Sequence, residues 1–192
     1  GQLKKDEIVL VSGAAGGVGM MVCLLAKIRG AKVIGIAGGK EKCDVLLNEI
    51  GVDASIDYKN QNINEQIKVH APEGIDIFFD NVGGNILDSA LDNLKDRARV
   101  VICGAISQYS HHDAVEGPSL YLRLAEKYAR MEGYTVMHFE EHYERAYNEL
   151  LKLYNDGKLN VPFHIEEGID NFPLALQKLF SGGNTGKLMV KI

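Results

Sequence analysis

Residues 9–19 read VLVSGAAGGVG, an apolar run that breaks into a glycine-rich turn. The run is short and rich in β-branched residues, which indicates a buried strand. From residue 17 to residue 29 apolar side chains recur at helical spacing, and Gly30 is placed to end a helix. This stretch therefore predicts a strand, a tight turn and a helix.

Strand and helix signals continue to alternate along the chain. Further strands are predicted at 32–37, 54–57, 75–80, 98–104 and 132–138, and further helices at 41–49, 62–70, 85–94, 119–130 and 142–156. Strands joined by helices of this length pair in parallel through right-handed crossovers. We therefore expect residues 1–159 to form an α/β domain, a doubly wound parallel sheet covered by helices on both faces.

The last part of the chain, residues 160–192, does not continue this alternation. It contains a strand-like segment at 162–168, a short helix at 171–180, a polar loop at 181–186 and a closing strand at 188–192. We expect these pieces to belong to a second structural unit.

Composition limits the classes of partner and location. The chain has 192 residues and a formal net charge of -5, which argues against nucleic acid or an anionic membrane as the main partner. No window approaches 18 consecutive apolar residues, and the N-terminus lacks the apolar core of a signal peptide. Cys23, Cys43 and Cys103 form no CxxC pair, which predicts reduced thiols in the cytoplasm and no metal site.

Counted from Ala14, the glycine loop has the form A-x-G-x-x-G, with Gly16 and Gly19 at the later positions. The dinucleotide-binding fingerprint has three glycines, for the tight turn, for close approach of pyrophosphate and for helix–strand packing. A slightly wider turn accepts the alanine. The following helix would direct its free N–H groups at a phosphate, and a purely structural turn is the alternative.

The end of the second predicted strand bears on which dinucleotide binds. NAD sites place Asp or Glu there to bind the ribose 2'-hydroxyl, whereas this chain reads AGGKEK from Ala37 to Lys42. The strand tip has no acid, and Lys40 and Lys42 follow it, which favours the 2'-phosphate of NADP(H). The alternative, that both lysines are solvated residues opening a helix, does not explain the missing acid.

Several segments, in order along the chain, resemble the zinc-independent medium-chain dehydrogenase/reductases. The matching stretches are SGAAGGVG, GIAGGKEKC, IDYK, FFDNVGG, CGAISQY, RMEGY and GGNTGK followed by VKI. They resemble most closely the leukotriene hydroxydehydrogenase/prostaglandin reductase branch, with its plant alkenal reductases and bacterial curcumin reductase. The resemblance implies a Rossmann-type NADP-binding domain.

The resemblance also implies cofactor-binding roles for individual residues. Pyrophosphate would lie on the backbone of Gly16, Gly17, Val18 and Gly19. Lys42 and Tyr58 would hold the 2'-phosphate, and Gly39 would leave room for it. Further contacts would come from Asn81, the segment Cys103, Gly104, Ala105, Ile106, Ser107 and Tyr109 near the nicotinamide, the backbone of Tyr134, Thr135 and Val136, and Asn184. Taken singly, three of these residues have an equally good structural explanation. Tyr58 would then be an aromatic residue on the rim, Asn81 a turn residue and Cys103 a core residue.

In this family NADPH passes a hydride to the β-carbon of an α,β-unsaturated ketone or aldehyde, and the enolate is then protonated. Animal and plant members carry a tyrosine four residues before the Arg-Met-Glu motif, but this chain has Glu126 there. Tyr121 is a candidate for the polar role near the enolate oxygen, and a surface or packing role is the alternative.

Family members also carry a GroES-like catalytic domain before the nucleotide-binding part, and the first predicted strand here begins at Ile8. The resemblance therefore implies a fragment with little turnover, in which residues 160–192 would pack on the absent domain. It further implies an enone or enal substrate and a homodimer formed through the nucleotide-binding domain. A quinone oxidoreductase of the same superfamily and a non-catalytic NADP(H)-binding module remain alternatives.

Overall fold

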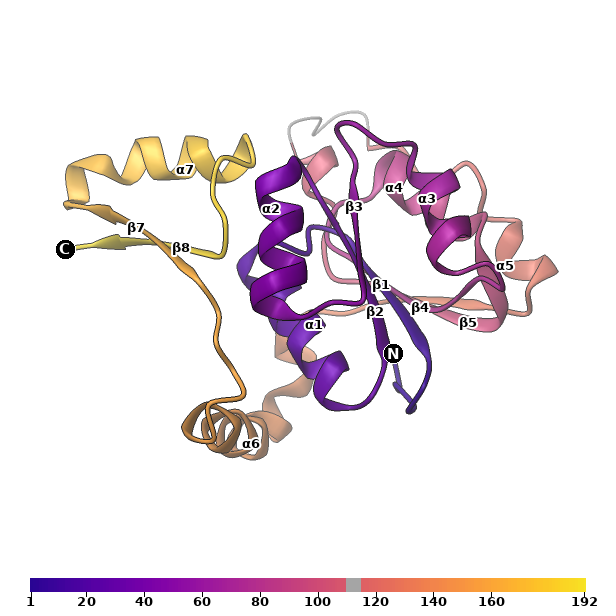
Figure 1. Cartoon of the computed structure of the whole chain (residues 1–192), viewed down its shortest axis with the longest axis horizontal. Helices are drawn as coiled ribbons and strands as arrows, with labels where there is room; N and C mark the ends of the chain where they lie inside the picture. The colour runs from indigo at the N-terminus through magenta and orange to yellow at the C-terminus, as the bar shows by residue number, and fades with distance from the viewer. Residues whose placement is uncertain (110–114) are drawn as a thin grey trace.

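A parallel six-stranded sheet forms the centre of the computed structural model, which describes residues 1–109 and 115–192. The strands lie in the order β3-β2-β1-β4-β5-β6 (Figure 1). The strand order reverses between β1 and β4, because β1 pairs with β2 on one side and with β4 on the other. The strands are β1 Ile8–Val11, β2 Lys32–Ala37, β3 Ala54–Asp57, β4 Ile75–Asp80, β5 Leu94–Ile102 and β6 Arg130–Gly133.

Helices cover both faces of this sheet. One face carries α1 and α2, and the opposite face carries α3 and α4 (Figure 1). The bounds are α1 Gly17–Ile28, α2 Lys40–Val45 continued by a π-helical turn Leu46–Ile50, α3 Ile63–His70 and α4 Gly84–Leu91. The doubly wound α/β fold predicted from the sequence is confirmed.

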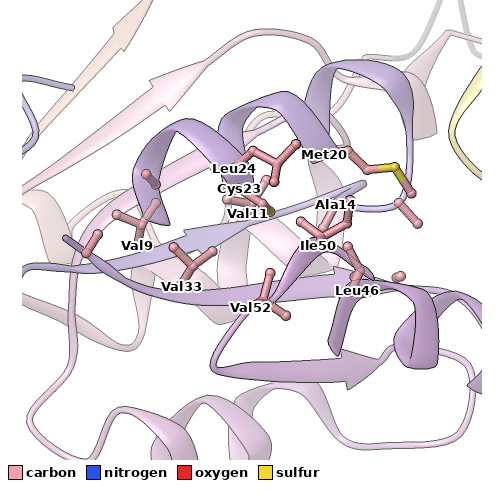
Figure 2. Close-up of a cluster of buried hydrophobic side chains, with 14 of the residues drawn as sticks. Val9, Val11, Ala14, Met20, Cys23, Leu24, Val33, Leu46, Ile50 and Val52 are labelled. Atoms are coloured by element: carbon pink, nitrogen blue, oxygen red, sulfur yellow. The ribbon is translucent and has the colours of Figure 1, made fainter. Parts of the chain in front are cut away.

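The core has two layers because neighbouring residues of each parallel strand point to opposite faces. Val9 and Val11 of β1 pack with Met20 and Cys23 of α1 (Figure 2). Leu10, between the two valines, packs in the other layer, which also contains residues of α3 and α4. Both layers are apolar, as expected for a sheet buried on both sides.

Two predicted elements beyond β5 are wrong in extent. The predicted strand 132–138 ends at Gly133, because a 3-10 helix, Val136–His142, begins shortly after it. Thr135 is the N-cap residue of this helix, and its N–H donates a hydrogen bond to the His138 side chain. The predicted helix 119–130 is reduced to α5, Arg123–Glu126. Before α5 the Arg123 N–H donates to the Leu120 carbonyl and the Leu124 N–H to the Tyr121 carbonyl, which are turn-type bonds, and after it Tyr128 adopts a left-handed conformation.

The C-terminal part forms a separate two-stranded parallel sheet, β7 Phe163–Glu167 with β8 Lys187–Lys191, beside α7 Phe172–Phe180. Helix α6, Tyr143–Asn155, precedes it, and Figure 1 shows the orange and yellow unit standing beside the main sheet. The Gly186 N–H donates to the Ala15 carbonyl over 2.8 Å, so β8 begins at the glycine loop. Within the described part of the chain, none of the helices has the length and apolar character needed to cross a membrane.

Candidate functional site

A cavity of about 1090 Å³ lies where the glycine loop, the β2–α2 turn, the loop after β4 and the C-terminal unit meet. The first three of these segments follow the carboxyl ends of β1, β2 and β4. In open α/β sheets, ligands bind outside the carboxyl ends of the strands where the strand order reverses. The cavity is at that position.

The glycine loop is packed so closely against the start of α1 that position 19 has no room for a side chain. A Cβ on Gly19 would lie 2.3 Å from the Gly13 carbonyl oxygen, so only glycine allows α1 to approach β1 this closely. Ala14, at the position of the fingerprint's first glycine, is fully buried. Gly35 of β2 makes room for it, since a Cβ there would lie 3.0 Å from the Ala14 methyl group.

Helix α1 begins at the cavity with its first turn uncapped by side chains. Gly16 is the N-cap residue, it makes no side-chain capping bond, and the first turn contains no acidic residue. The first N–H groups of a helix lack intrahelical partners and carry its positive dipole end. The predicted residues Gly16, Gly17, Val18 and Gly19 all line the cavity.

Lys42 and Tyr58 line the cavity on the side of β2 and β3. Burial, and then the nearby charge of Lys59, lowers the pKa of Lys42. The Tyr58 side chain lies against Gly38, where a Cβ would come within 2.8 Å of two ring carbons and the hydroxyl oxygen. Gly39 does not line the cavity, but its φ of +96° shapes the turn that leads into α2.

Asp57, at the end of β3, belongs to this corner of the site although no local sequence pattern indicated it. Its carboxylate is 9% exposed and accepts a 2.7 Å hydrogen bond from the Gly39 N–H. The hydrogen bond from the Asn60 side chain, and then that from Gly39, lowers the pKa of Asp57. The register of β2 and β3, which places Asp57 beside Ala37, is the feature that brings an acid here.

A buried hydrogen-bond network shapes the loop after β4. The Ser12 hydroxyl donates to the Asp80 carboxylate over 2.7 Å, and the same carboxylate accepts bonds from the Val82 and Gly83 N–H groups. The backbone N–H of Asn81 donates to the Ser12 hydroxyl oxygen, and the side-chain amide of Asn81 donates to the Ser12 carbonyl. Asn81 lines the cavity in an orientation fixed by these bonds.

The structure separates the residues predicted near the nicotinamide. Ile106 and Ser107 line the cavity, whereas Cys103, Gly104, Ala105 and Tyr109 lie just outside its lining. The Tyr109 hydroxyl accepts a 3.3 Å hydrogen bond from the Ala105 N–H, which ties this segment together.

Tyr134, Thr135 and Val136 also lie outside the lining of the main cavity. The Tyr134 ring packs edge-on against Phe79 and Phe139 at a second, apolar cavity of about 590 Å³. Burial, and then its hydrogen bond with Cys103, raises the pKa of Tyr134.

The C-terminal unit contributes one wall of the main cavity. Asn184 is buried, and its amide donates to the Gly186 carbonyl over 3.0 Å. The apolar residues on and next to α7 line the cavity, although no local sequence pattern indicated this. They reach the cavity only because the C-terminal unit packs beside the glycine loop. They are Ile169, Phe172, Ala175, Leu176, Leu179 and Phe180.

Tyr121 is not brought to the cavity. It is 58% exposed and lies in the turn before α5, rather than on one helix with Glu126 as the sequence suggested. Among residues 1–109 and 115–192, no group of three or more His, Cys, Asp or Glu side chains could hold a metal ion. His111 and His112 lie outside the described residues.

The fold and the cavity together define a Rossmann-type domain with a site at the switch point of its sheet. Residues 17–154 match the family described as "Zinc-binding dehydrogenase". Since this match covers more than half of the chain, the protein belongs to that family, as the sequence resemblance predicted.

Individual relatives agree with this assignment. The NADP(+)-dependent 2-alkenal reductase of Nicotiana tabacum is 40% identical over 190 residues, which are 98% of this chain and 55% of that protein. Prostaglandin reductase 1 of Bos taurus is 40% identical over 192 residues, 98% of this chain and 58% of that protein. The crystal structure of CurA from Vibrio vulnificus in complex with NADPH superposes with a TM-score of 0.93 at 36% identity, covering 100% of this chain and 58% of that one. The chain thus spans less than two thirds of these relatives.

Proposed function

We propose that this chain is the NADP(H)-binding part of an oxidoreductase that reduces the C=C bond of α,β-unsaturated ketones and aldehydes. The observation that carries the proposal is a single cavity at the sheet's switch point, lined by the glycine loop, Lys42, Tyr58, Asn81 and Asn184. The names of the alkenal and prostaglandin reductases, and the NADPH bound by CurA, support it.

The residues present fit a dinucleotide phosphate. A Cβ at Gly19 would collide with the loop backbone, so the close approach of the first turn of α1 to the loop depends on glycine at this position. The first turn of α1 carries no acid that would repel pyrophosphate, and no side chain caps its N–H groups. Lys42 uses one of its three N–H donors on the Gly182 carbonyl, which leaves two for a 2'-phosphate.

Each part of the cavity then has a role. Gly16, Gly17, Val18 and Gly19 bind pyrophosphate through their backbone, and Lys42 and Tyr58 bind the 2'-phosphate beside the turn at Gly39. Asn81 and Asn184, which both line the cavity, orient the ribose and nicotinamide. Ile106 and Ser107, which line the cavity, border the nicotinamide end. Cys103, Gly104, Ala105, Tyr109 and the backbone of Tyr134, Thr135 and Val136 lie outside the lining, and in this proposal they border the nicotinamide from beyond it.

When bound, the reduced nicotinamide supplies the hydride that is added to the β-carbon of the enone. The apolar residues of α7 line the cavity and give it an apolar wall. The division into a nucleotide-binding unit, residues 1–159, and a segment 160–192 that packs on a further catalytic domain belongs to the same proposal. On this proposal the chain alone binds NADPH but turns over little substrate.

The chain also has features that support a homodimer. Strand β6 pairs with β5 on one side and lies at the edge of the sheet, and all four of its residues are exposed. An exposed edge strand can pair with a second copy. Sedimentation velocity should give a dimer for the wild type and a monomer for Met131→Pro, and a wild-type monomer would contradict this part of the proposal.

A cytoplasmic location is part of the proposal as well. Cys23, Cys43 and Cys103 are all free thiols, and Cys23 and Cys43 are buried. Reduced cysteines are typical of the cytosol.

Binding is tested by titrating the chain with NADPH and with NADH. We expect NADPH to bind at least about tenfold more tightly, the difference that a charge-assisted contact to one phosphate provides. Equal affinities would contradict the assignment to NADP(H). Failure of both to bind would contradict the proposed function itself.

Turnover is tested with the full gene product, comparing an enone with a quinone. Faster reduction of the quinone would identify a quinone oxidoreductase instead, and NADPH binding without turnover of either would identify a non-catalytic module. Tyr121→Phe belongs in the same assay. Lower turnover with unchanged NADPH affinity would support a catalytic role for Tyr121, and unchanged turnover would end that hypothesis.

A further inference from the structure

Asp57 stands next to the place where NAD-binding domains carry their ribose-binding acid. That acid normally follows β2. Here Ala37, the last residue of β2, is the register partner of Asp57 on β3, and the Tyr58 N–H donates to the Ala37 carbonyl over 3.1 Å. A carboxylate is therefore present at this corner, supplied by the neighbouring strand.

The oxygens of this carboxylate are engaged within the protein. One oxygen accepts hydrogen bonds from the Gly39 N–H over 2.7 Å and from the Lys59 N–H over 3.0 Å. The other accepts a 2.7 Å hydrogen bond from the Asn60 side-chain amide. With 9% of its surface exposed, Asp57 directs its carboxylate to donors in the loops that follow β2 and β3.

The bond to Gly39 fixes the turn that carries the proposed 2'-phosphate site. Gly39 is the N-cap residue of α2 and has a left-handed φ of +96°. Lys42 lies in the first turn of that helix, and the Tyr58 ring packs directly on Gly38. Asp57 thus links the strand that leads into Tyr58 to the turn that leads into Lys42.

We propose that Asp57 is a positioning residue for dinucleotide selectivity, whose carboxylate holds the turn 38–40 so that Lys42 and Tyr58 face the same 2'-phosphate. This rests on the proposed function, because it concerns the adenosine end of the same site.

The effect of removing the Asp57 carboxylate on phosphate binding separates a positioning role from the effect of a nearby negative charge. A negative charge close to a phosphate repels it, so removing an unimportant carboxylate would tighten phosphate binding. Removing a positioning carboxylate frees the Gly39 turn and weakens phosphate binding. The two explanations therefore predict opposite changes.

The test is calorimetric titration of the 192-residue chain with adenosine 2',5'-bisphosphate and with 5'-AMP, which differ only in the 2'-phosphate. We expect the wild type to prefer the bisphosphate. In Asp57→Ala the preference should fall by about tenfold, the effect of losing a hydrogen bond to a charged group. In Asp57→Asn it should stay within about threefold of the wild type, since the amide oxygen still accepts from Gly39.

Asp53→Ala is the matched control. Asp53 also accepts a 2.7 Å hydrogen bond from a backbone N–H, that of Val33, but at the amino ends of the same two strands. It should lower stability and leave the nucleotide preference unchanged.

The outcomes distinguish a failure of the proposed NADP(H) site from a failure of the role of Asp57. A wild type without preference for the bisphosphate would overturn the proposed function together with this inference. If the wild type prefers the bisphosphate and the Asp57→Ala variant keeps or increases this preference, only the role of Asp57 is overturned. If the alanine variant does not fold, Asp57→Asn decides, because a preference raised more than about threefold would show that Asp57 acts only through its charge.

Discussion

The ammonium nitrogen of Lys42 lies 2.6 Å from the carbonyl oxygen of Gly182, a residue 140 positions further along the chain. This bond joins the first turn of α2 to the loop before β8 across the main cavity. Together with the bond from Gly186 to Ala15, it attaches the C-terminal unit to the nucleotide loop. A ligand phosphate at Lys42 would share the lysine with this loop.

Replacing Lys42 with methionine keeps the aliphatic stem but removes the charge. We expect the affinity for NADPH to fall by about ten- to a hundredfold, the effect of one lost charge-assisted contact, and the affinity for NADH to change little. Lys40→Met, a neighbouring exposed lysine paired with Asp44, is the control and should leave both affinities unchanged. Equal losses for NADPH and NADH would place Lys42 outside the 2'-phosphate site.

Gly19→Ala should destabilise the domain strongly. The new methyl group would lie 2.3 Å from the Gly13 carbonyl oxygen, so α1 must move away from β1. We expect a loss of about 2–3 kcal/mol in the free energy of unfolding, measured by urea denaturation. Gly117→Ala, where no atom lies within 4 Å of the added Cβ, should be close to neutral. A neutral Gly19→Ala would mean that the close helix–strand contact is not needed.

Ser12→Ala tests the buried network behind Asn81. The variant leaves the Asp80 carboxylate without its hydroxyl donor and the Asn81 N–H without its acceptor. Unsatisfied buried groups cost about 1–3 kcal/mol each, so stability should fall by at least about 1 kcal/mol, and NADPH affinity should fall as Asn81 loses its orientation. Ser89→Ala removes a hydroxyl that bonds only within α4 and should change neither quantity. An unaltered unfolding curve for Ser12→Ala would contradict the role of the network.

The pair of Glu7 and Arg99 should make stability depend on pH. Burial alone would raise the pKa of Glu7, but the hydrogen bonds from the Arg99 side chain and the Lys4 N–H, together with the charges of both residues, outweigh it and lower this pKa. A carboxylate with a lowered pKa in the folded state contributes its full stability above its unfolded pKa, and the contribution is lost as the pH falls through the folded value. Glu7→Gln should therefore be less stable than the wild type by about 1–2 kcal/mol at pH 7.

This difference should shrink as the pH falls below about 4.3, the ordinary value for glutamate. Denaturation at a series of pH values measures it, with the exposed Glu49→Gln as the control. A difference that stays constant from pH 7 to pH 3 would contradict the ion pair's contribution.

The sequence predicted the elements whose signals are local. The apolar run before Gly13, the helical periodicity after Gly16 and the strand of residues 75–80 all depend on nearby residues, and the structure has these elements. The helix predicted at 119–130 is only four residues long in the structure, because residues 120–125 form turns with i→i+3 hydrogen bonds and Tyr128 has a positive φ.

Contacts between distant segments could not be read from the sequence. The alanine at position 14 is accommodated by Gly35, which lies on another strand. Asp57 reaches the β2–α2 turn only through the register of β2 and β3. The apolar wall from α7 requires the C-terminal unit to return to the glycine loop, a closure that no local pattern encodes.

The most direct test of the central claim is a crystal structure of this chain with NADPH bound. The account predicts pyrophosphate at the first turn of α1, and the 2'-phosphate within about 3.2 Å of both the Lys42 ammonium and the Tyr58 hydroxyl. An adenosine end bound anywhere other than between Lys42 and Tyr58 would contradict it.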